Sequence, residues 1–243
     1  MGDSQRAQLL EALNALYHHP DSTVRKQADR WLEDWQGTPQ AWSTADAVLH
    51  DASASMEAQY FCAQTLRTKV QRDYEELPVG AADSLSGSLV QLLLRFARGA
   101  PPVRTQLCLA LAALPQHMPA ASWGQGGIIQ WLARHLTQGQ SGSEGVSCLL
   151  EMLTVIPEEA GSYQAAIRPE RRREYLSELM ACTSGALELL GSCLQGYPGS
   201  ESTKRQVLEA FASWSRLSGG VGMDGAWLSQ HPLVQAALQG LES

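Results

Sequence analysis

Residues 55–78 read SMEAQYFCAQTLRTKVQRDYEELP, a stretch with the periodicity of a helix that has two unlike faces. At about 100° per residue, one broad face collects the apolar side chains of Met56, Tyr60, Ala63, Leu66, Val70 and Tyr74. The opposite face carries Phe61, Thr65, Thr68 and Arg72, flanked by Gln64 and Lys69. A large aromatic ring among polar groups predicts that either a neighbouring helix or a partner covers this second face.

Upstream of this stretch, the sequence predicts a pair of helices joined by a tight turn. Residues 5–17 and 23–35 both have helical periodicity, and Pro20 and Asp21 separate them. In the second helix, one face carries Val24, Ala28, Trp31, Leu32 and Trp35. The other face carries Lys26, Asp29, Arg30 and Glu33.

Similar pairs of apolar-periodic runs follow along the whole chain. The run ending near residue 49 pairs with the opening stretch, 84–98 pairs with 101–114, and 122–136 pairs with 148–157. A fifth pair begins with a first helix through 168–180 and 186–194, followed by its partner at 203–217. First helices recur every 35–55 residues or so, and no strand alternation occurs. The prediction is an all-α superhelix of HEAT or armadillo type, with about five hairpins.

The last apolar segment, LVQAALQGL after His231 and Pro232, has no second helix. A solenoid normally ends in a polar capping helix, because each repeat buries its apolar sides against its neighbours. We therefore expect residues 1–243 to form one N-terminal solenoid domain of a longer chain.

Composition narrows the class of partner. Apolar residues make up 44% of the chain, and 18 Lys plus Arg against 25 Asp plus Glu give a net charge of −7. This balance argues against nucleic acid and favours basic protein partners. Five separated cysteines without a Cys-x-x-Cys pair indicate reduced core residues of an intracellular protein. No apolar run reaches about 18 residues, so no membrane span is predicted.

No motif supports an enzyme, a cofactor or a metal site. Residues 220–225 match G-x-G-x-x-G, but an amphipathic helix precedes them where a nucleotide fold needs a strand, which indicates a loop. The six histidines have no metal-ligand spacing and lie mostly at predicted helix ends. No nucleophile and base can be paired by spacing.

Two conspicuous clusters have ordinary explanations. The basic residues Arg168, Arg171, Arg172 and Arg173 are interrupted by Glu170 and Glu174, which favours a solvated, salt-bridged first helical turn over a phosphate site. The tryptophans, including Trp31, Trp35, Trp42 and Trp214, have the helical spacing of side chains that pack between repeats.

Five segments together resemble importin-β-type nuclear transport receptors, and within them the transportin-SR group, which imports serine/arginine-rich splicing factors. The matches are ALYHHP (15–20), YFCAQTLRTKVQRDYEELP (60–78), TQLCLALAAL (105–114), LLEMLTVIPEEA (149–160) and the helix start at 171–174. They lie in the right order over nearly the whole chain. The Gly/Ser-rich segments around Gly139 and Gly220 depart from the family pattern and are expected between helices.

The resemblance implies a carrier that shuttles between cytoplasm and nucleus under the control of the GTPase Ran. In that family, second helices of the first repeats bind Ran-GTP, which implies a site here of Lys26, Asp29, Arg30, Glu33, Phe61, Gln64, Thr65, Thr68 and Arg72. It also implies contact of the first-helix surface with Phe-Gly nucleoporins and binding of Arg/Ser-rich cargo by more C-terminal repeats. This chain alone is therefore expected to bind Ran-GTP weakly, if at all, and not to import cargo.

Two alternatives stay open. A sister receptor of the same family carries cargo in both directions and resembles the same segments. A HEAT-repeat scaffold would assemble another complex without Ran, but would give no reason for the polar face of residues 60–78 to match receptors that bind Ran.

Overall fold

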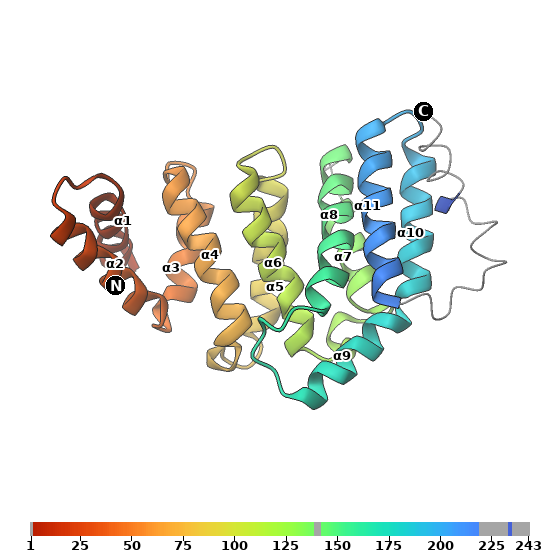
Figure 1. The fold of residues 1–243 in the computed structure, drawn as a ribbon, viewed down its shortest axis with the longest axis horizontal. Coiled ribbons are helices and arrows are strands. Elements are labelled where there is room, and N and C mark those ends of the chain that lie inside the picture. Colours follow the sequence, from red (N-terminus) through yellow and green to blue (C-terminus); the bar gives the residue numbers. More distant parts are fainter. Residues whose placement is uncertain (1, 139–141, 219–232, 235–243) are drawn as a thin grey trace. The chain divides into compact units, whose positions relative to one another are not determined.

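In the described part of the chain, the fold consists of α-helices (Figure 1) and two short 3₁₀ helices. A computed structural model describes residues 2–138, 142–218 and 233–234, and these residues contain no strand. The chain divides into two compact units, residues 1–111 and 112–243. The all-α prediction is confirmed.

The first unit is built from helical hairpins. Its elements are α1 (Gly2–His18), α2 (Ser22–Gln36), α3 (Gln40–His50), α4 (Met56–Arg72), η1 (Tyr74–Glu76), α5 (Ala81–Arg95) and the start of α6 (Pro101–His117). Helix α1 packs on α2, α3 packs on α4, and α1 also contacts α3 and α4. The opening stretch of the sequence is thus the second helix of the second hairpin, as predicted.

Polar side chains cap the end of α1 and the starts of α2 and α4. The Asp21 carboxylate accepts a hydrogen bond from the Thr23 amide at 2.7 Å and caps α2. The guanidinium of Arg25 donates to the carbonyl oxygens of His19 and Pro20, at 2.7 and 2.9 Å. The hydroxyl of Ser55 accepts from the Ala58 amide and caps α4. These two turns therefore use polar groups that the sequence places beside them.

The second unit contains the end of α6 and the later helices. These are η2 (Ala120–Trp123), α7 (Gly127–Thr137), α8 (Gly142–Ala160), α9 (Pro169–Ala181), α10 (Thr183–Gly196) and α11 (Glu201–Ser218). Helix α7 packs on α8, α10 packs on α11, and α11 also packs on α8.

The prediction of one first helix for the fifth hairpin is wrong, because this segment forms two helices, α9 and α10, that are separated at Cys182. Helix α10 is the partner of α11, and α9 is an additional helix. The residues after the break, Thr183, Ser184 and Gly185, are weak helix formers, which accounts for the interruption.

Helix α8 continues through Pro157 to Ala160, beyond the residue where the sequence predicts its end. Proline has no N–H, so the carbonyl of Leu153, four residues earlier, loses its usual helical donor. The indole Nε1 of Trp214 in α11 donates to this carbonyl oxygen at 2.8 Å, and the Trp214 side chain is fully buried. A tertiary hydrogen bond thus replaces the missing helical one and ties α11 to α8.

This replacement predicts an energetic coupling between Trp214 and Pro157. Trp214→Phe should cost about 1–3 kcal/mol, in part because it leaves the buried Leu153 carbonyl without a donor. In a Pro157→Ala background the restored backbone N–H can satisfy that carbonyl, so the same substitution should cost less. Urea unfolding of the four variants measures the difference. Equal costs in both backgrounds would contradict the account.

Four of the five cysteines lie in the core, as predicted. Cys62, Cys108, Cys148 and Cys193 are buried, and burial raises the pKa of Cys62 to about 12. Cys182 is only half-buried, because it lies at the break between α9 and α10. None of the five is in a disulfide.

Several predicted segments fall partly or wholly outside the described residues. The G-x-G-x-x-G match at 220–225 lies outside them, and of the last predicted helix only 233–234 are described, both helical. Residues 142–145 belong to α8, so the predicted Gly/Ser-rich loop ends earlier than expected. In the described chain, no helix combines the length and the apolar character that a membrane crossing requires.

Candidate protein-binding face

Helix α2 presents a stripe of charged side chains to solvent. We define the α2 stripe as Lys26, Asp29, Arg30 and Glu33, all of which are exposed. The opposite side of the helix buries Ala28, Leu32 and Trp35, which explains why the charges point outward. Within the described chain, no residue of the stripe makes an ion pair. Two positive and two negative charges are therefore open to a partner.

The predicted polar face of α4 divides into exposed and buried parts. Gln64 and Arg72 are exposed, Phe61 and Thr68 are half-buried, and Thr65 is fully buried. We define the α4 face as Gln64, Thr68 and Arg72. Neither Thr68 nor Arg72 has a side-chain hydrogen bond or ion pair within the described residues.

Helix α2 is the element that covers the aromatic ring of α4. The rings of Trp35 and Phe61 lie 6.1 Å apart between centroids, and Trp31 stacks on Trp35 at 6.5 Å with a 16° interplanar angle. Of the two coverings expected for Phe61, the neighbouring helix is thus present in this chain. Trp31 keeps 37% of its surface exposed, so only part of its side chain packs against the protein.

Thr65 uses its hydroxyl within the protein. The Gln36 side-chain amide donates to Thr65 Oγ1 at 2.8 Å, and the hydroxyl donates to the Phe61 carbonyl at 2.8 Å. Because Thr65 is fully buried, its part in the predicted site is to join the last residue of α2 to α4.

Lys69 was expected beside the polar face but is 1% exposed. Its ammonium group pairs with the carboxylates of Asp73 at 3.1 Å and Glu76 at 2.9 Å. It also lies 3.4 Å from the Gln36 carbonyl oxygen and 5.3 Å from the Trp42 ring centroid. The indole N–H of Trp42 donates to Glu76, and the hydrogen bond from Lys69 holds the pKa of Glu76 below its usual value. A buried cation thus joins α2, α3, α4 and η1.

The resulting surface is suited to binding a protein rather than to catalysis. The α2 stripe and the α4 face lie on neighbouring helices, with a buried seam of ring and hydrogen-bond contacts between them. Among the residues that the structure describes, no three His, Cys, Asp or Glu side chains gather to hold a metal ion. Mixed charges on a firm helical surface favour a partner with a complementary charge pattern.

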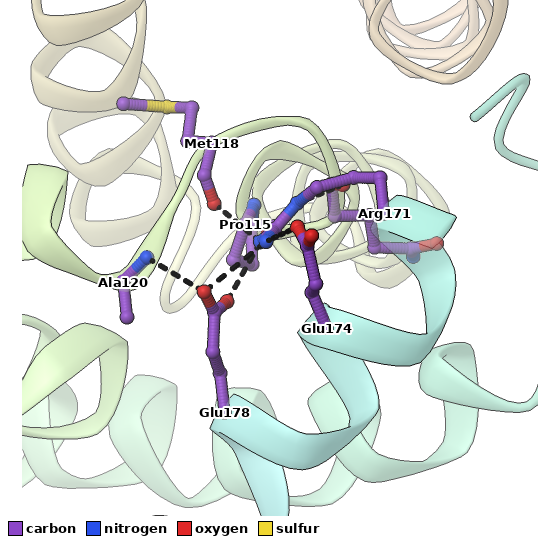
Figure 2. Close-up of polar contacts among 7 residues, drawn as sticks. Pro115, Met118, Ala120, Arg171, Glu174 and Glu178 are labelled. Carbon is purple, nitrogen blue, oxygen red and sulfur yellow. Dashed lines mark hydrogen bonds and ion pairs between the residues drawn. The ribbon is translucent and has the colours of Figure 1, made fainter. Parts of the chain in front are cut away.

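The basic cluster of α9 is less solvated than the sequence suggests. Figure 2 shows Arg171 between Glu174, Glu178 and the end of α6. Its guanidinium donates to the carbonyl oxygens of Pro115, Gln116 and Met118, at 3.2, 3.2 and 2.8 Å. Two further bonds reach the Glu178 carboxylate, at 3.1 and 2.7 Å. Arg171 therefore caps the C-terminus of α6 from α9.

Arg172 and Arg173, which follow Arg171 on α9, differ from each other in their contacts. Arg173 is exposed and pairs with Glu170 at 3.2 Å, as predicted for a salt-bridged first turn. Arg172 donates to the carbonyl oxygens of Ser162 and Ala165 and lies over the Tyr163 ring. Two of the four cluster residues thus organise the chain around α9.

The Arg171 contact predicts a pH dependence of stability. The hydrogen bond from Arg171 lowers the pKa of Glu178 from its ordinary value of 4.5. A folded-state pKa below the unfolded value stabilises the protein above about pH 4.5, and this stabilisation is lost as the pH falls through the folded-state pKa. We expect Glu178→Gln to be less stable than wild type at pH 7 and to approach it below about pH 4. Urea unfolding across this range measures the effect, and a constant difference at all pH values would contradict it.

Two protein-family models match this chain. The family model described as Importin-beta N-terminal domain matches residues 28–95, and the model described as Exportin 1-like protein matches residues 100–243. Transportin MOS14 of Arabidopsis thaliana is 53% identical over 231 residues, which cover 95% of this chain and 23% of that protein. Importin-13 of Homo sapiens is 34% identical over 211 residues, or 85% of this chain and 21% of that protein. The chain thus spans less than a quarter of the length of these relatives.

Proposed function

Because the chain belongs to the importin-β family, we propose that it supplies the N-terminal, Ran-GTP-binding repeats of a nuclear import receptor. The observation that carries this proposal is the α2 stripe of unpaired charges beside the α4 face. Both surfaces lie almost wholly within the residues that match the Importin-beta N-terminal domain model.

The charge pattern explains how such a surface would select a partner. The α2 stripe alternates sign, with Lys26 and Arg30 one turn apart and Asp29 and Glu33 one turn apart. A partner must therefore place opposite charges in the same order, and a uniformly charged surface gains little. In this proposal the GTP-bound state of Ran presents that order, and its binding disfavours the cargo-bound state through a coupling free energy.

Cargo and pore contacts complete the proposed cycle. We propose Arg/Ser-rich proteins, including serine/arginine-rich splicing factors, as cargo, bound by repeats that follow residue 243. The net charge of −7 supports a basic cargo. Phe-Gly nucleoporins would bind the first-helix surface while the receptor shuttles between cytoplasm and nucleus.

A sister receptor of the same family, which carries cargo in both directions, is the second candidate, because the resemblance of the sequence leaves it open. An import receptor and a bidirectional receptor differ in how Ran-GTP changes the affinity for cargo. Imported cargo is released by Ran-GTP, whereas exported cargo binds together with it. Measuring cargo affinity of the full receptor with and without Ran-GTP separates the two.

The Ran proposal is tested by titrating this chain with Ran loaded with GTP and, separately, with GDP. We expect weak binding with at least about a tenfold preference for the GTP form, a difference of about 1.4 kcal/mol. Isothermal titration calorimetry at high protein concentration measures both affinities. Equal binding of both nucleotide forms by a chain with normal helical content would overturn the proposal for these residues and favour the scaffold alternative. If neither form binds, the same titration of the full receptor decides, and equal or absent binding there would overturn the proposal.

A further inference from the structure

The side-chain contacts between α2 and α4 gather at one end of α2. In the described chain, the hydrogen bonds and ring contacts between these helices involve only Trp35 and Gln36 on the α2 side. Their partners on α4 are Phe61, Thr65 and Lys69, which are spaced four residues apart and so share one face. We call this set of five residues the α2–α4 joint.

Lys69 is the most deeply placed charge in the joint. It is the only charged residue among the fully buried large side chains of the described chain. Its ammonium has three donor hydrogens, and the groups within reach are the Gln36 carbonyl, Asp73 and Glu76. The Gln36 carbonyl is one of the four at the C-terminus of α2 that lack a helical donor. Lys69 therefore attaches the end of α2 to the end of α4.

The α2 stripe lies along α2 on the N-terminal side of this joint, so a small rotation of α2 at the joint displaces the stripe residues, and displaces Lys26 the most. Lys26 is ten residues from Gln36, which corresponds to about 15 Å along the helix axis. A tilt of α2 by about 10° at the joint would move Lys26 by about 2.6 Å. Such a displacement is enough to break a charge-assisted hydrogen bond of about 2.8 Å to a partner. Helix α1 holds α2 on another side, so the joint is one of two supports.

We propose that Lys69 is a positioning residue for Ran-GTP. It sets the spacing of the α2 stripe and the α4 face without touching the partner. The inference rests on the proposed function for its binding consequence, but its structural part can be tested without Ran. Lys69 has almost no exposed surface for contact, whereas the residues it positions are exposed on both helices.

Lys69→Met is the variant that tests the joint, because it keeps the length of the side chain and removes the charge. The Gln36 carbonyl would lose its donor, and Asp73 and Glu76 would lose the cation between them. Both carboxylates are about one third exposed, with side-chain values of 32% and 35%, so water can solvate them and the chain can stay folded. Thr65→Val is a second, milder variant, which removes the hydrogen bonds of Gln36 and the Phe61 carbonyl.

The structural measurement is the distance between spin labels at Arg30→Cys and Gln64→Cys, two exposed positions, by pulsed electron resonance. A Cys182→Ser background removes the one half-buried thiol. Arg30 is six residues from Gln36, or about 9 Å along the helix axis, so a 10° tilt in Lys69→Met should shift or broaden the distance by about 1.6 Å. Leu89→Ala, a destabilising change in α5, should leave the distance unchanged. An unchanged distance in both Lys69→Met and Thr65→Val would overturn the proposal.

The binding measurement is a double-mutant cycle with Ran-GTP on the same chain. Lys26→Ala should weaken binding about fivefold in the wild-type background and less than twofold in the Lys69→Met background. In that background the tilt of α2 has already moved Lys26 away from its contact on Ran-GTP. Arg72→Ala should cost the same in both, since Arg72 lies on α4. Strictly additive effects at Lys26 would overturn the positioning role. Absence of Ran-GTP binding by the wild type would instead count against the proposed function, while the label distance still decides the joint.

Discussion

Arg171→Met is expected to destabilise the second unit by about 2–4 kcal/mol. The substitution keeps the aliphatic stem but leaves the carbonyls of Pro115, Gln116 and Met118 without their donor. It also leaves the Glu178 carboxylate without its cation. That carboxylate is 29% exposed, so water recovers part of the loss and the effect falls short of a fully buried pair.

The matched control for this prediction is two residues further along the same helix. Arg173→Met removes an exposed pair with Glu170 and should cost no more than about 1 kcal/mol. Denaturant unfolding followed by circular dichroism measures both variants. If Arg171→Met cost no more than Arg173→Met, the assignment of Arg171 as the cap of α6 would be wrong.

Reversing two charges, Arg30→Glu together with Arg72→Glu, is expected to weaken Ran-GTP binding about 100-fold. Both arginines are exposed and have no ion pair in the described chain, so the change should not disturb the fold. A partner surface that complements the wild-type pattern would then meet like charges at two points. Phe61 is unsuitable for this test, because its ring packs on Trp35 and its removal would loosen α2.

A control variant with the same change of net charge distinguishes the effect of charges on the proposed binding surface from the effect of the total charge of the chain. Arg168→Glu together with Arg205→Glu alters two exposed arginines of the second unit. Its effect should stay within about threefold and should diminish with added salt. Comparable weakening by the two double variants would mean that binding depends on total charge and not on the α2 stripe and the α4 face.

Periodicity was sufficient to predict the helices and their pairing through most of the chain. The buried positions Ala63, Leu66 and Val70 follow from the apolar face of residues 56–70, and the α2 stripe follows from its spacing opposite Ala28 and Leu32. These features depend on the helical repeat and the burial of apolar surface, both of which are encoded locally.

Periodicity failed where a distant residue decides the local structure. Pro157 indicates a helix end, but α8 continues because Trp214, 61 residues away from Leu153 in sequence, supplies the lost hydrogen bond. Arg171 likewise serves carbonyls more than 50 residues away. No window of sequence contains both partners of such contacts.

The sequence around Lys69 indicates only weakly that its side chain is buried. Asp73 and Glu76 follow it at four and seven residues, the spacing of side chains on one helical face. This spacing indicates an ion pair but not its depth, because the cover comes from Trp42 and the end of α2. Met56 shows the reverse error, since it belongs to the apolar face by spacing but lies at the start of α4 and is 60% exposed.

The central claim is that Ran-GTP binds the α2 stripe and the α4 face, and amide hydrogen exchange of this chain with Ran-GTP or Ran-GDP tests it most directly. Exchange in residues 26–33 and 64–72 should be slower with the GTP form and unchanged with the GDP form. Protection confined to the second unit, or equal protection by both nucleotide forms, would contradict it.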